Sequence, residues 1–132
     1  VIHISTDCVF SGFEGNYSEE ALRNADDIYG RSKALGELKD NLNLTLRSSI
    51  IGPEIKKNGE GLFDWFMKQK GEIKGYTNAY WNGITTLQLA KVISIGINEN
   101  LAGLYHVTNG MKISKYDLLK IIKNIWCKDD VI

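Results

Sequence analysis

Hydrophobic residues gather in three short runs that are bounded by polar or turn-forming residues. The runs cover residues 1–5, 44–51 and 103–108. They are rich in Val, Ile, Leu and Thr, and they lack the strict alternation of a strand with one face in water. We therefore predict three buried strands, as in a parallel sheet that is covered on both faces.

Hydrophobic spacings of three, four and seven residues between these runs predict helices. A first helix is expected over residues 26–42, where Asp26 and Asp27 make a favourable start, and a second over residues 60–70. Capping boxes at residues 85–88 and 114–117 predict two more helices. Strands that alternate with helices predict an α/β fold with a mostly parallel sheet. The expected inward residues are Ile28, Leu35, Leu38 and Leu42 in the first helix, and Leu89, Val92, Ile93 and Ile97 after the first capping box.

The composition fits one ordinary globular domain and narrows the classes of partner. The 132 residues carry 16 Lys plus Arg and 16 Asp plus Glu, hence no net charge. Without a basic excess we expect neither nucleic-acid binding nor attraction to an anionic membrane surface. No apolar run reaches the roughly 20 residues of a membrane-spanning helix, and no signal peptide is recognisable, so we expect a cytoplasmic location. Cys8 and Cys127 lack metal-ligand spacing, and we predict no metal site and two free thiols.

Tyr29 and Lys33 are the first candidates for chemistry. They stand four residues apart in the first predicted helix, so their side chains share one face. An ammonium group near a phenol stabilises the phenolate, and such a tyrosine can pass a proton to a carbonyl oxygen that is being reduced. On spacing alone, an exposed tyrosine with a solvated lysine one turn away is the more common interpretation.

Other candidates follow the predicted strands or lie in loops. Thr6 comes directly after the first strand, where open α/β sheets bind ligands. Without Tyr29 and Lys33 we would favour a turn residue that caps the strand end. Trp81, Asn82 and Thr85 suit a pocket for a sugar or a base, and loop packing is an equally good interpretation. Arg47 could contact a phosphate, but we favour a local ion pair. We interpret His3 and His106 as structural.

Four sequence strings together resemble the extended short-chain dehydrogenases/reductases. They are ISTDCVFSG at residues 4–12, YSE at 17–19, YGRSKALGE at 29–37 and LRSS at 46–49. Within that group the chain looks most like the dTDP-4-dehydrorhamnose reductase branch of sugar-nucleotide reductases. The order, spacing and predicted context all match, strongly over residues 1–52 and more weakly to residue 132.

The resemblance implies a Rossmann-like parallel sheet and the NAD(P)H-dependent reduction of a nucleotide-linked 4-keto-deoxysugar. Tyr29 is implied as the proton donor, and Lys33 as the residue that stabilises the phenolate of Tyr29 and binds the nicotinamide ribose of NADPH or NADH. Thr6 is implied to orient the substrate carbonyl. Residues 1–52 would hold the catalytic strand, the Tyr/Lys helix and the following strand, and residues 53–132 the substrate-binding region.

The sequence departs from this family in three places, one of which is the approach to Tyr29 at residues 25–28, which lacks the Pro common there in the family. Cys8 stands where the branch often has an aromatic residue, and we interpret it as a small buried thiol. No Gly-rich turn of the GxGxxG or GxxGxxG kind occurs, so we expect the N-terminal dinucleotide-binding half to be absent. We therefore expect this C-terminal piece to bind the cofactor weakly or not at all and to be inactive alone. The strand at residues 1–5 would leave an open edge, which a second copy of the chain, giving a homodimer, or a rearrangement would cover.

Two other functions stay open. An epimerase or dehydratase of the same superfamily uses the same Tyr and Lys but returns the hydride to its substrate. Some relatives of this fold serve instead as regulatory or binding subunits, although a binding module has no need of a tuned proton donor.

Overall fold

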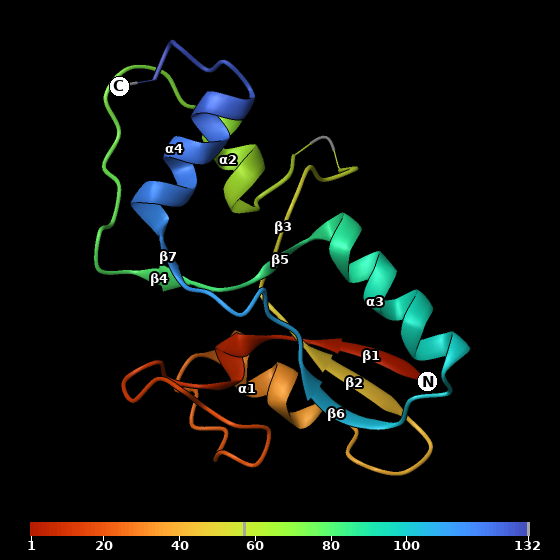
Figure 1. The fold of residues 1–132 in the computed structure, drawn as a ribbon. Coiled ribbons are helices and arrows are strands. Elements are labelled where there is room, and N and C mark those ends of the chain that lie inside the picture. Colours follow the sequence, from red (N-terminus) through yellow and green to blue (C-terminus); the bar gives the residue numbers. More distant parts are fainter. Residues whose placement is uncertain (57, 132) are drawn as a thin grey trace.

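A computed structural model describes residues 1–56 and 58–131 and shows an α/β fold with a three-stranded parallel sheet (Figure 1). The strands are β1 (Ile2–Ser5), β2 (Leu44–Arg47) and β6 (Gly103–His106), in the order β1-β2-β6. Their register places Ser5, Arg47 and His106 side by side where the three strands end. The parallel sheet predicted from the hydrophobic runs is confirmed.

One face of the sheet is apolar and is covered by α3 (Thr86–Asn98), which lies across it in Figure 1. Thr85 caps this helix by accepting the N–H of Gln88, as the capping box predicts. Ile97 is 59% exposed, so its expected inward position is wrong. Gly96 is buried there instead. A glycine is needed at this position, because a Cβ would come within 2.6 Å of Leu44.

The opposite face is polar and is covered by the end of α1 (Ile28–Leu35) and the segment after it. Thr45 projects from this face and donates a hydrogen bond of 2.7 Å to the carbonyl of Leu38. Because Asp40 accepts the N–H groups of Leu42 and Asn43, the chain turns here instead of continuing as a helix. The predicted helix over residues 26–42 is therefore too long.

The exposed face of α1 also differs from the prediction. Ile28 and Leu35 are 88% and 89% exposed, so they do not point inward as expected. The helix begins at Ile28, two residues after the predicted start, because the side chain of Asp27 caps it by accepting the N–H of Gly30. Its inner surface is made instead by small residues such as Gly30, which is buried.

The predicted strand over residues 44–51 is two strands that belong to different sheets. After β2 the chain bends at Ser48, whose hydroxyl donates to the carbonyl of Val107 at 2.8 Å. It then forms β3 (Ile50–Ile51), which pairs in parallel with β5 (Ile84–Thr85). This pair leads to a second part of the structure (Figure 1).

The second part packs α2 (Leu62–Lys68) against α4 (Lys115–Ile125). Ser114 caps α4 by accepting the N–H of Asp117, so the second capping box is confirmed. A two-stranded antiparallel ladder of β4 (Tyr80–Trp81) and β7 (Ile113–Ser114) borders this part. The buried hydrophobic residues at its centre are Phe63, Phe66, Leu118, Leu119, Ile122 and Val131.

Side chains satisfy the backbone at both edges of the three-stranded sheet. Leu44 of β2 donates its N–H to the carbonyl of Val1, so the backbone groups of Val1 face β2. Because neighbouring residues of a strand direct their backbone groups to alternate sides, the carbonyl of Ile4 points away from β2. Lys33 donates to that carbonyl at 2.6 Å. On the far edge, His106 donates its N–H to the carboxylate of Glu19 at 2.9 Å. Each edge thus has one backbone group bound by a charged side chain, and charged side chains at an edge disfavour further strand pairing.

Candidate functional site

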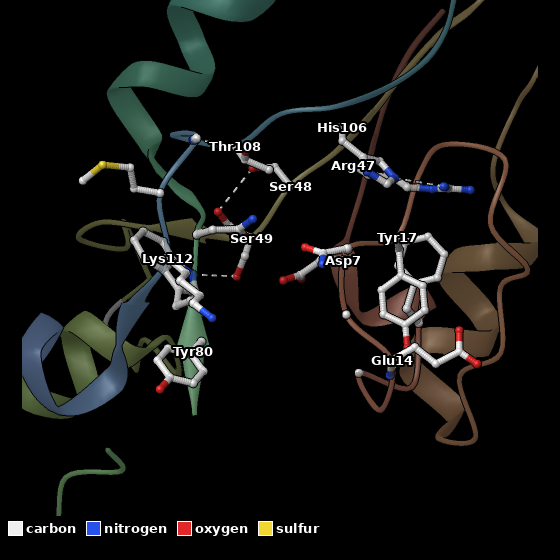
Figure 2. Close-up of a pocket in the computed structure, with 18 of the residues that line it drawn as sticks. Asp7, Glu14, Tyr17, Arg47, Ser48, Ser49, Tyr80, His106, Thr108 and Lys112 are labelled. Carbon is white, nitrogen blue, oxygen red and sulfur yellow. Dashed lines mark hydrogen bonds between the residues drawn. The ribbon is translucent and has the colours of Figure 1, made fainter. Parts of the chain in front are cut away.

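The three parallel strands end at a cleft of about 1020 Å³ (Figure 2). Asp7 follows β1, Ser48 follows β2 and Thr108 follows β6, and all three line the cleft. This is the edge at which open parallel sheets bind ligands. The opposite wall comes from β4 with its neighbouring residues and from the segment that precedes β7. Further lining residues include Phe10, Tyr17, Ser49, Tyr80, Trp81, Asn82 and Lys112.

Arg47 lies at the floor of the cleft and is neutralised by Glu37. Its Nε and Nη2 atoms are each 2.7 Å from one oxygen of the Glu37 carboxylate, which also accepts the hydroxyl of Ser5 at 2.6 Å. Burial would raise the pKa of Glu37, but the hydrogen bonds from Arg47 and Ser5 outweigh it and hold the pKa below its ordinary value. Arg47 is only 4% exposed. The predicted local ion pair is confirmed.

His106 is the neighbour of Arg47 on the next strand. Its Nε2 atom is 3.1 Å from Nη1 of Arg47. A guanidinium group can only donate, so Nε2 accepts, and the imidazole is neutral with its proton on Nδ1. Burial lowers the pKa of His106, and the charge of Arg47 lowers it further against the opposing carboxylate of Glu19. These bonds fit the structural role expected for His106, although His106 also lines the cleft.

The loop after β1 forms one wall of the cleft and is bound by Arg47 and His106. Phe10 stacks on Tyr17 with ring centroids 4.4 Å apart, and the guanidinium of Arg47 lies 5.1 Å from the Phe10 ring. Arg47 also donates to the backbone carbonyl of Glu19. The hydrogen bond from the N–H of His106 lowers the pKa of Glu19, which keeps that carboxylate charged. The wall is therefore preorganised.

Thr6 lies at the end of β1, where it holds the short 3₁₀ helix η1 (Asp7–Val9). Its hydroxyl oxygen accepts the N–H of Cys8 at 3.2 Å, and its hydroxyl is 3.2 Å from a carboxylate oxygen of Asp7. Gly30 packs directly on this turn, because a Cβ there would overlap the carbonyl of Cys8. The turn that carries Thr6 and the first turn of α1 are thus in contact. Cys8 itself is exposed, so the expected buried thiol is wrong.

Tyr29 and Lys33 project from α1 beside this turn. Tyr29 is 56% exposed, and its hydroxyl makes no hydrogen bond to another described residue. Lys33 has three donor hydrogens, of which one goes to Ile4. Thr6, Tyr29 and Lys33 do not line the cleft themselves, whereas Asp7, next to Thr6, does. Their catalytic roles stay predictions.

The predicted substrate-binding residues divide into two groups. Trp81 and Asn82 line the cleft, and the indole N–H of Trp81 donates to the hydroxyl of Ser49 at 2.8 Å. Thr85 caps α3 and does not line the cleft. Contact of these three residues with a substrate stays a prediction.

Sequence reasoning did not single out Asp7, Tyr17, Ser48, Ser49 or Lys112 as site residues. Asp7 carried a usable signal, since it follows Thr6 at the end of the first predicted strand, where open α/β sheets bind ligands. Ser48 carried none, because it lies inside the strand predicted over residues 44–51. Lys112 carried none, because its position depends on the pairing of β7 with β4.

The described residues show no group of three His, Cys, Asp or Glu side chains that could hold a metal ion. Nor does any helix within residues 1–56 and 58–131 combine the length and the hydropathy needed to cross a membrane.

Comparisons with known proteins match nearly the whole chain. Residues 1–130 match the family model of the RmlD substrate binding domain. A crystal structure described as a hypothetical dTDP-4-dehydrorhamnose reductase from Sulfolobus tokodaii is 29% identical, with a TM-score of 0.76 over 98% of this chain and 47% of that chain. The dTDP-4-dehydrorhamnose reductase of Bacillus anthracis str. Ames, solved in complex with NADP, is 28% identical, with a TM-score of 0.80 over 99% of this chain and 48% of that chain. The Rossmann-like fold class is thereby confirmed.

A curated relative is named as the subunit of a different enzyme. The methionine adenosyltransferase 2 subunit beta of Rattus norvegicus is 25% identical over 131 residues, which cover 89% of this chain and 39% of the rat protein. The chain thus spans about half the length of the solved relatives and less of the curated one.

Proposed function

The chain belongs to the RmlD substrate-binding domain family, and from that premise we propose that it forms the sugar-nucleotide side of an NAD(P)H-dependent reductase of 4-keto-deoxysugars. The observation that carries the proposal is the contact of Gly30 with the turn after β1. It brings the helix of Tyr29 and Lys33 against Thr6, next to a cleft large enough for a nucleotide sugar.

The residues present fit the nicotinamide end of the cofactor. Tyr29 offers a hydroxyl that is free of other described partners, and Lys33 keeps two donor hydrogens besides the one given to Ile4. When bound, the cofactor supplies the hydride. Tyr29 and Lys33 would hold its nicotinamide ribose. The sequence contains no Gly-rich turn to cradle the pyrophosphate.

Three side chains would take part in the reduction of the sugar carbonyl. Negative charge develops on the carbonyl oxygen as it is reduced, and Tyr29 donates its proton to that oxygen. The ammonium of Lys33 stabilises the phenolate that remains. Thr6, whose hydroxyl lies beside Asp7 in this structure, would donate to the same oxygen and orient it. Trp81 and Asn82 would contact the sugar or the base from the cleft. Thr85, which caps α3, would contact the substrate as well.

The test is the oxidation of NADPH in the presence of a dTDP-linked 4-keto-deoxysugar, measured on the longest natural protein that carries this chain. Tyr29→Phe removes the proton donor, and we expect kcat to fall by about 10²–10⁴-fold. Tyr76→Phe is the matched control, because Tyr76 is exposed and does not line the cleft. An unchanged rate in Tyr29→Phe would contradict the mechanism. Substrate turnover without net NADPH oxidation would indicate an epimerase or dehydratase.

A non-catalytic subunit is the second candidate, because the rat relative is a subunit beta of methionine adenosyltransferase 2. This alternative predicts stable co-purification with an unrelated enzyme and no reductase activity at natural length. Reductase activity that depends on Tyr29 would exclude it.

A further inference from the structure

The two walls of the cleft differ in charge. The wall that follows β1 contributes the carboxylates of Asp7, Glu14 and Glu19. The wall made by lining residues 78–82 and 110–112 contains no carboxylate, and Lys112 is its charged residue. Figure 2 shows Asp7 and Glu14 on one side and Lys112 on the other. The diphosphate of a ligand would therefore be favoured at the Lys112 wall and disfavoured at the wall of Asp7 and Glu14.

Lys112 is the cation in this cleft that remains available to an anion. Arg47 is buried and bonded through two nitrogens to Glu37. His106 is neutral, because its Nε2 accepts a hydrogen bond from Arg47. Within the described parts of the chain, Lys112 forms no ion pair with a carboxylate.

Tyr80 holds the ammonium group of Lys112 in place. Its ring centroid is 4.6 Å from Nζ, within the range of a cation–π interaction. In the antiparallel β4–β7 ladder Tyr80 faces Ser114, two residues along from Lys112. Tyr80 and Lys112 are therefore diagonal neighbours, a spacing that aromatic and long side chains can bridge. An ammonium group that is already positioned loses less conformational entropy when it binds a ligand.

We propose that Lys112, held over Tyr80, binds the diphosphate of the nucleotide sugar. This inference rests on the proposed function and adds the residue that anchors the ligand's diphosphate. A diphosphate is repelled by the carboxylates of Asp7 and Glu14 and attracted by the compact charge of a lysine. The sugar then extends toward Asp7, whose carboxylate can accept hydrogen bonds from its hydroxyl groups, and toward the turn of Thr6.

The test uses NMR titrations of the chain with dTDP and with thymidine, which lacks the phosphates. In Lys112→Met the affinity for dTDP should fall by about tenfold or more, since a hydrogen bond to a charged group is lost, while thymidine binding stays unchanged. Lys112→Arg keeps the charge and the contact with the ring, so it should retain most of the affinity. Tyr80→Leu should cost about two- to fivefold, and Tyr80→Phe, which keeps the ring, much less.

Lys120→Met is the matched control, because Lys120 also lies over a tyrosine, Tyr116, at 5.3 Å but does not line the cleft. Equal dTDP affinity in wild type, Lys112→Met and Lys120→Met would overturn the role of Lys112 and leave the proposed function standing. Absence of dTDP-induced shifts at the cleft of the wild type would overturn the proposed function and this inference together. An equal loss in Lys112→Met and Lys120→Met would show a nonspecific charge effect and overturn the inference alone.

Discussion

Arg47 connects three parts of the molecule through one guanidinium group. It binds Glu37 after α1, the carbonyl of Glu19 in the cleft wall and the ring of His106 on β6. A lysine could not replace these bonds, because they use the planar, fork-like arrangement of the guanidinium nitrogens. The floor of the cleft is therefore a rigid support for the ligand and does not itself supply a free charge.

The neutral state of His106 predicts a loss of stability in mild acid. Its pKa lies below the ordinary 6.5 in the folded chain because burial disfavours the imidazolium ion. The unfolded chain then binds a proton that the folded chain excludes, so this contribution to stability is complete above about pH 6.5 and is lost as the pH falls below it. We expect urea unfolding to show a smaller free energy of unfolding at pH about 5.5 than at about 7.5.

His106→Gln tests the assignment, because a glutamine can still accept from Arg47 but does not titrate. This variant should show a smaller difference between the two pH values than the wild type. His3→Gln is the matched control, since it removes the other histidine of the chain and leaves the contact of His106 with Arg47 in place. Equal pH dependence in the wild type and His106→Gln would contradict the prediction.

Among the elements, those that depend on local chemistry were predictable from the sequence. Thr85 and Ser114 mark the starts of α3 and α4 correctly, because a capping bond spans three residues. The end of α1 was not predictable, since Glu37 leaves the helical path to meet Arg47 on another element. The break after β2 depends in the same way on the bond of Ser48 to Val107.

The same distinction holds for the candidate site. Trp81 and Asn82 were recognisable as candidates from their residue types, and the structure places both in the cleft. The position of Lys112 opposite Asp7 follows from the way two distant loops meet, which no local pattern encodes.

The contact of α1 with η1 predicts that Gly30→Ala destabilises the chain. Helix propensity alone would favour alanine by about 1 kcal/mol, but the added Cβ overlaps the carbonyl of Cys8. We expect a net loss of about 1–3 kcal/mol in the free energy of unfolding, measured by urea denaturation. Gly36→Ala is the matched control, because its Cβ would meet its nearest neighbour, His3, at 3.6 Å. A Gly30→Ala variant as stable as Gly36→Ala would show that this contact is not tight.

At the scale of the whole molecule, the cleft lies between two separately packed parts. One hydrophobic cluster joins the three-stranded sheet to α3, and the other joins α2 to α4. The β4–β7 wall borders the second part, whereas the loop that carries Asp7 and Tyr17 follows the sheet of the first (Figures 1 and 2). A ligand in the cleft would contact both parts and so stabilise their arrangement.

Cofactor binding by the 132-residue chain tests whether the chain holds only the nicotinamide end of the cofactor site. The sequence holds the residues for the nicotinamide end, Tyr29 and Lys33, but no Gly-rich turn to bind the pyrophosphate through backbone N–H groups. We therefore expect titration calorimetry to show NADPH binding no tighter than roughly millimolar.

Reduced nicotinamide mononucleotide, which lacks the adenosine half, should bind about as well as NADPH, because the rest of NADPH would find no site. Lys33→Met should weaken both ligands alike, since each would contact Lys33 through the same ribose. Micromolar NADPH binding, or a clear preference for NADPH over the mononucleotide, would show that this chain contains a pyrophosphate site of another kind.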